Sequence, residues 1–124
     1  MKMKMVCFAV LLATSVLLLG GCGKKSANMN NPTSAGTTPV AAANVSIQNF
    51  AFSPAKVYVL PGGSVTWTNK DVSPHTATDI GGTFDSGSLA TDQTFKKTFA
   101  TAGTYTYHCT IHSMMATATV VVGN

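Results

Sequence analysis

The 124-residue chain contains no arginine and no glutamate, so its charged residues are eight lysines and four aspartates. The formal net charge is +4, but the lysines are unevenly placed along the chain. Four of them precede position 26, and from Asn44 onward four lysines balance four aspartates. The part of the chain that can fold is therefore neutral, and a nucleic-acid-binding surface of clustered cations is not supported.

Cysteine is also scarce. Cys7, Cys22 and Cys109 are too few for a disulfide scaffold, and neither C-x-x-C nor C-x-x-C-H occurs, which argues against thioredoxin-like chemistry and covalently attached haem. Long hydrophobic runs are lacking as well. The most apolar stretch, 6–19, has fourteen residues, whereas about 20 are needed to span a bilayer.

The N-terminal 21 residues are predicted to be an export signal, because two lysines precede that short apolar stretch. The sequence Leu19-Gly20-Gly21-Cys22 resembles a bacterial lipobox, which implies that 1–21 is a lipoprotein signal peptide and that Cys22 carries lipid. A plain signal peptide cut after Gly21 is the alternative. In the lipoprotein interpretation Cys109 is the only thiol left in the mature domain.

Residues 22–43 are predicted to be a lipidated cysteine followed by a disordered tether. The stretch 24–43 has no aromatic residue and is rich in Ser, Thr, Asn, Ala and Pro, so it cannot bury enough apolar surface to fold. Such a tether would hold the domain on the order of 25 Å from a membrane. We therefore expect a protein of the cell envelope, anchored to the membrane by its lipid and facing the periplasm or the exterior.

Residues 44–124 are predicted to be one all-β domain. Apolar residues recur there at every second position in short runs separated by Gly, Pro, Asn and Asp. This pattern favours a Greek-key β-sandwich of about seven to eight strands. The expected features are a first strand from Val45 that can extend to Phe52, a turn at Pro61-Gly62-Gly63 between two strands, an edge strand or bulge around Lys97, a strand over 103–109 and a last strand over 116–122.

Four potential metal ligands stand out in this domain. Cys109, His112 and Met115 follow the strand over 103–109 within one short loop, and His75 follows Pro74 in an earlier loop. A thiolate, two imidazoles and a thioether suit copper in both of its oxidation states, with the thioether as a weak axial ligand. Pro74 restricts the backbone next to His75, so a stiff segment can present this imidazole.

This pattern resembles the cupredoxins, the small blue copper proteins, and within them the amicyanin and plastocyanin group. The resemblance covers 44–124, and its short C-x2-H-x2-M loop is the amicyanin form. The matching residues are Pro74-His75 and Tyr105-x-Tyr107-x-Cys109-x2-His112-x2-Met115. Two residues depart from the family pattern. Met114 replaces a bulky apolar residue and is a rival axial ligand, and Thr76 stands where many members have Asn.

The resemblance implies one copper ion, held by His75, Cys109, His112 and Met115 and cycling between Cu(I) and Cu(II). Because protein ligands fill every position, we expect an electron carrier and not an enzyme. Family analogy places electron exchange at the edge of His112, within an apolar docking patch for which Pro74, Ile111 and Met114 are the candidates. The implied partner is a c-type cytochrome, a dehydrogenase or a terminal reductase, and the domain is expected to be monomeric.

Other functions fit parts of the same pattern. A periplasmic copper carrier or storage lipoprotein would use the same ligands and release its ion to an acceptor. A Cys–His hydrolase would need an oxyanion hole, which the surroundings of Cys109 do not suggest, and an adhesive sandwich module would bind no copper. Among the other aromatic residues, strand parity directs His108 to solvent, while Tyr105 and Trp67 are expected to be structural.

Overall fold

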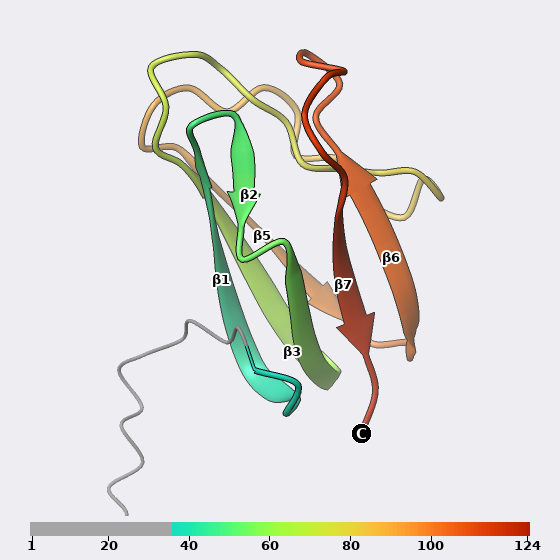
Figure 1. Cartoon of the computed structure of the whole chain (residues 1–124). Coiled ribbons are helices and arrows are strands. Elements are labelled where there is room, and N and C mark those ends of the chain that lie inside the picture. The colour runs from blue at the N-terminus through green and yellow to red at the C-terminus, as the bar shows by residue number, and fades with distance from the viewer. Residues whose placement is uncertain (1–35) are drawn as a thin grey trace, which may run out of the picture.

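The computed structural model describes residues 36–124, and the predicted signal peptide, Cys22 and most of the tether lie outside the described residues. Seven strands and no helix form this part of the chain (Figure 1). The strands are β1 (Val40–Gln48), β2 (Ala51–Ser53), β3 (Lys56–Asn69), β4 (Thr78–Asp79), β5 (Thr94–Phe99), β6 (Gly103–His108) and β7 (Ala118–Val122). The predicted all-β class is confirmed.

Strand β3 belongs to both layers of a sandwich. Its first part, 56–59, pairs in parallel with β7, which continues through β6 to β4. Its second part, 64–69, pairs in parallel with β1 and antiparallel with β5, and β2 extends this layer beyond β1. Within the described residues β5 pairs only with β3, so the strand around Lys97 lies at an edge, as its mixed pattern predicted.

The turn predicted at Pro61-Gly62-Gly63 is a bend inside one long strand. Gly62 has a φ of 86°, which a side chain would disfavour. A Cβ on Gly63 would lie 2.8 Å from the Leu60 carbonyl oxygen and 2.9 Å from that of Ala41. Because Gly63 has no side chain, the backbones of β3 and β1 can approach closely here, and β3 passes from one layer to the other without reversing direction.

The first strand differs from its prediction at both ends. It begins at Val40, four residues before the expected domain boundary at Asn44, because backbone pairing with β3 orders a segment that has little apolar side chain. It also stops at Gln48 and does not extend to Phe52. Asn49 and Phe50 both adopt positive φ angles, of 54° and 57°, and the chain folds back into β2 through this two-residue turn.

The core lies between the two layers and is aromatic at its centre. Trp67 from β3 is fully buried and packs edge-to-face on Tyr107 from β6, with ring centroids 5.4 Å apart. Burial raises the pKa of Tyr107 far above its usual range, so its hydroxyl stays protonated at neutral pH. Tyr105 donates a hydrogen bond from its hydroxyl to the Thr101 carbonyl, 2.8 Å away, which fits the structural role predicted for it.

Candidate metal centre

Loops from three parts of the chain meet at the end of the sandwich opposite the C-terminus (Figure 1). Cys109 follows β6 directly, and His112 lies in the loop from β6 to β7. His75 lies between β3 and β4, where its backbone amide and carbonyl both pair with Leu89. Cys109 and His112 from one loop and His75 from another thereby reach one place, as the sequence predicted.

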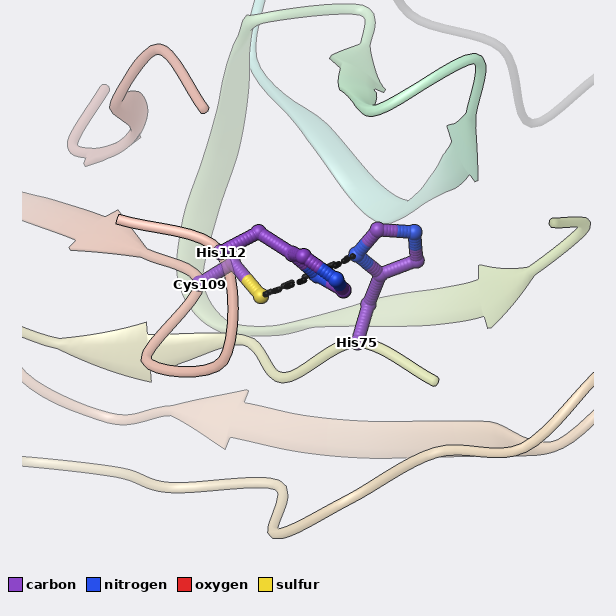
Figure 2. A group of neighbouring side chains, drawn as sticks. All are labelled: His75, Cys109 and His112. Atoms are coloured by element: carbon purple, nitrogen blue, oxygen red, sulfur yellow. Dashed lines mark hydrogen bonds between the residues drawn. The ribbon is translucent and has the colours of Figure 1, made fainter. Parts of the chain in front are cut away.

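The three side chains direct their donor atoms at a common point (Figure 2). Cys109 Sγ lies 3.7 Å from His75 Nδ1 and 3.8 Å from His112 Nδ1, and the two Nδ1 atoms are 3.2 Å apart. His75 Nε2 lies 2.9 Å from a carboxylate oxygen of Asp71. This contact places the His75 proton on Nε2, so Nδ1 keeps its lone pair for a metal.

The spacing of these donors fits a first-row metal ion. A point equidistant from the three atoms lies about 2.1 Å from each of them. Metal bonds to imidazole nitrogen and thiolate sulfur are about 2.0–2.3 Å long, so one ion can contact all three donors without displacement of the loops. The sulfur and nitrogen donor set is one that copper favours.

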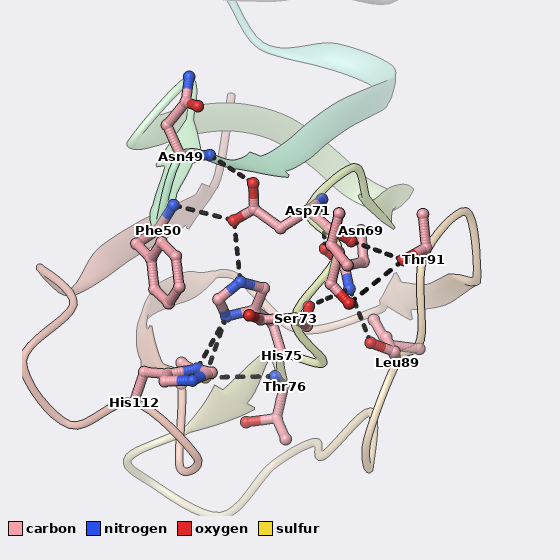
Figure 3. Close-up of polar contacts among 12 residues, drawn as sticks. Asn49, Phe50, Asn69, Asp71, Ser73, His75, Thr76, Leu89, Thr91 and His112 are labelled. Atoms are coloured by element: carbon pink, nitrogen blue, oxygen red, sulfur yellow. Dashed lines mark hydrogen bonds and ion pairs between the residues drawn. The ribbon is translucent and has the colours of Figure 1, made fainter.

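Asp71, which the sequence did not single out, connects His75 to the β1–β2 turn (Figure 3). Its carboxylate accepts hydrogen bonds from the backbone amides of Asn49 at 2.7 Å and Phe50 at 2.9 Å, besides its contact with His75. The Phe50 amide is the main reason that the pKa of Asp71 lies below its usual value, and the Asn49 amide and His75 act in the same direction. One ionised carboxylate thus orients a ligand and fixes a distant turn.

Phe50 is the second residue that the sequence did not assign to the site. Its ring packs edge-to-face on both histidine rings, with centroids 5.1 Å from His75 and 5.0 Å from His112. The left-handed backbone at this residue costs roughly 1–2 kcal/mol for a side chain of this kind. The local sequence pattern does not predict the contact of Phe50 with the histidines, because the conformation of the turn determines where the ring lies.

The sulfur of Cys109 is fully buried and receives a hydrogen bond from the Thr76 backbone amide at 3.4 Å. Because the donor is backbone, the replacement of the family's Asn by Thr leaves this bond in place. The Thr76 hydroxyl also accepts a bond from the Thr110 amide at 2.8 Å. Thr76 therefore joins the loop that carries His75 to the loop that carries Cys109 and His112.

Asn69 braces the same region from the end of β3. Its buried side-chain amide donates to the carbonyls of Ser73 at 2.9 Å and Leu89 at 2.8 Å, and its Oδ1 accepts the Asp71 amide at 2.9 Å (Figure 3). These bonds hold the backbone that precedes His75 and the Leu89 backbone that pairs with it. The segment that carries His75 is therefore held in place by protein contacts alone, without a metal.

The two adjacent methionines differ sharply in exposure. Met115 is 6% exposed and its backbone amide bonds to the His112 carbonyl, whereas Met114 is 90% exposed. The other two predicted patch residues, Pro74 and Ile111, are exposed as well. His108 stays outside the ligand cluster, but the prediction that it faces solvent is only partly met. It is half-buried, and its Nδ1 has no hydrogen-bond partner among residues 36–124.

Fold and site together define a cupredoxin. Residues 40–123 match the family described as copper binding proteins, plastocyanin/azurin family, and the chain belongs to this family. The amicyanin of Paracoccus denitrificans is 30% identical over 116 residues, covering 84% of this chain and 88% of that protein. The amicyanin of Paracoccus versutus is 28% identical, with 88% and 90% covered.

Solved structures show the same relationship. A purple cupredoxin from Nitrosopumilus maritimus aligns with a TM-score of 0.60 and 29% identity, over 65% of this chain and 99% of that one. An amicyanin mutant in its Cu(I) form aligns with a TM-score of 0.61 and 31% identity, over 66% of this chain and 82% of that one. The family binds copper and transfers electrons without acting as an enzyme, so copper, one ion for the domain, is the cofactor of this chain.

Proposed function

We propose that this protein is a one-electron carrier whose copper is held by His75, Cys109, His112 and Met115 and whose chain is tethered to the bacterial cell envelope. The observation that carries the ligand assignment is the convergence of Cys109 Sγ and two Nδ1 atoms at bonding distance from one point. Copper supplies the exchange between Cu(I) and Cu(II) when bound. The residues supply a fixed set of donors that changes little between the two states.

Bracing around the ligands supports electron transfer over metal delivery. Asp71 orients His75, and Thr76 joins the two loops that carry the ligands. Ligands held in this way reduce the rearrangement that accompanies gain or loss of an electron. His75, Cys109, His112 and Met115 would together fill the positions around a bound copper ion, so none would be left for a substrate.

The test is to add Cu(II) to the folded chain and to record metal content, visible spectrum and electron exchange. We expect one copper per chain, an intense visible band from thiolate-to-Cu(II) charge transfer, and reduction by a small electron donor without loss of copper. Rapid release of copper to a chelator under the same conditions would instead indicate a copper carrier.

The axial ligand is tested by a pair of matched substitutions. Met115→Leu should keep copper and shift the reduction potential, because the thioether is the weak ligand that tunes it. Met114→Leu should change neither, because this side chain is almost wholly in solvent. Potentiometric titration of both variants measures the shift. The opposite pattern would assign the axial position to Met114.

Docking of the redox partner is proposed at the patch formed by Pro74, Ile111 and Met114. All three are exposed next to the ligands, and residues 44–124 carry no net charge, so apolar contact is favoured over long-range steering. Met114→Glu should slow electron exchange with a partner such as a c-type cytochrome, a dehydrogenase or a terminal reductase by about tenfold, which corresponds to about 1.4 kcal/mol. The visible spectrum should stay unchanged; stopped-flow absorbance measures both, and an altered spectrum would contradict a docking role.

Attachment to the envelope is proposed from the lipobox-like sequence that ends at Cys22. A tether of about twenty residues would let the domain reach partners near the membrane surface. Fractionation of cells that produce the full chain should recover it with the membranes and labelled by radioactive palmitate. Release as an unlabelled, shorter protein would support the plain signal peptide.

A further inference from the structure

The Asn49–Phe50 turn is strained at one residue and held by another. Phe50 adopts a left-handed backbone that bulky side chains avoid. Its amide and that of Asn49 both donate to the Asp71 carboxylate, which lies 21 and 22 residues further along the chain. A strained backbone conformation persists only where several surrounding contacts enforce it, and such residues are frequent at functional sites.

The anchor of this turn is itself fixed. The Asp71 backbone amide donates to Asn69 Oδ1 at 2.9 Å, and its carbonyl accepts the Thr91 hydroxyl at 2.8 Å (Figure 3). The carboxylate therefore has a defined position before it meets the turn. The carboxylate holds the Asn49–Phe50 turn in one conformation, in which the Phe50 ring is directed at the two histidines.

The Phe50 ring is the outer layer over both imidazoles. Phe50 is 48% exposed, whereas His75 and Cys109 beneath it are fully buried. Its contacts with His75 and His112 are both edge-to-face, at interplanar angles of 85° and 83°. This geometry is attractive between aromatic rings and resists tilting of either histidine.

We propose that Phe50 is the cap of the copper site. Its ring holds both imidazoles over the Cys109 sulfur and keeps water and small anions from the metal, while Asp71 holds the cap in position. This role rests on the proposed function where it concerns copper. The contact of the Phe50 ring with the two imidazoles does not depend on the proposed function, because it is present in the metal-free chain.

Phe50→Gly tests the cap without a penalty in the backbone, since glycine adopts positive φ freely. In the metal-free full chain, iodoacetamide labelling of Cys109 should become about tenfold faster, a factor that corresponds to about 1.4 kcal/mol. Mass spectrometry of the tryptic peptide 98–124 measures this cysteine separately from Cys7 and Cys22. In the copper-loaded chain, azide should perturb the visible spectrum at about tenfold lower concentration than in the parent.

Two matched variants separate the ring from the backbone. Asn49→Gly relaxes the neighbouring turn residue and keeps the ring, so its labelling rate and azide response should equal those of the parent. Phe50→Tyr keeps an aromatic edge and should also match the parent. The thermal unfolding midpoint of each variant identifies any change that comes from loss of folding.

The outcomes are distinct. If Phe50→Gly labels at the parent's rate, or if Asn49→Gly labels as fast as Phe50→Gly, the ring is not the cap and the proposal is wrong. If labelling accelerates as expected but the parent binds no copper, the proposed function fails while the hold on the imidazoles stands. Faster labelling together with stronger azide binding, confined to Phe50→Gly, supports the full proposal.

Discussion

Cys109→Ser should abolish the intense visible absorption of the copper-loaded protein. That band needs a thiolate bound to Cu(II), and Cys109 is the only cysteine of the described residues. A serine hydroxyl of similar size can occupy the buried position, but it is a far poorer ligand for copper at neutral pH. Copper affinity should fall by more than the 10–100-fold that loss of an outer-shell partner typically costs.

Absorption spectroscopy and metal analysis of the purified variant measure both effects. His108→Gln is the matched control, because His108 is adjacent to Cys109 in sequence and outside the donor cluster. The control should keep the band and the copper. Retention of the band by Cys109→Ser, or its loss in the control, would refute the assignment of the thiolate ligand.

Trp67→Ala should lower the free energy of unfolding by about 3–5 kcal/mol, a large part of the stability of a domain this small. Trp67 is fully buried and packs on rings from both layers, with centroids 5.7 Å from Phe95 in β5 and 5.4 Å from Tyr107 in β6. Its removal leaves a cavity that the surrounding strands cannot close. Urea denaturation of the metal-free chain, followed by circular dichroism, measures the change.

Tyr107→Phe is the control for this prediction. It removes a buried hydroxyl and keeps the ring that contacts Trp67 and Phe52. The expected change is about 1 kcal/mol or less, because this hydroxyl has no hydrogen-bond partner among residues 36–124 and its removal breaks no bond there. A Trp67→Ala variant that unfolds at the same urea concentration as Tyr107→Phe would show that the two layers are not held together by this aromatic contact.

Local sequence pattern was sufficient to predict the fold class and the donor cluster. Alternation of apolar residues predicts strands because side chains of a strand alternate between faces. The spacing of Cys109, His112 and Met115 confines them to one loop, so their proximity follows from the chain itself. His75 was included because a second imidazole completes a donor set that suits copper, and the structure brings its Nδ1 to the same point.

Contacts between distant segments could not be predicted in this way. Asp71 resembled a loop residue, because its partners at Asn49 and Phe50 lie in a turn that the hydrophobic pattern continued as a strand. A phenylalanine in a left-handed conformation contradicts local preference, and the bonds of this turn to Asp71 hold it there. The bend of β3 escaped prediction for a similar reason, since Pro61-Gly62-Gly63 also suits a chain reversal.

The membership of β3 in both layers has a consequence for the order of events in folding. Its pairing with β7 joins Val57 to Val120, and its pairing with β1 is parallel, so both require closure of long loops. Topologies dominated by such distant contacts fold slowly. We expect His75 and Cys109 to meet only after these strands have paired, so that copper would bind to a chain that has already folded. The rate at which the holoprotein appears would then be set by the assembly of the strands.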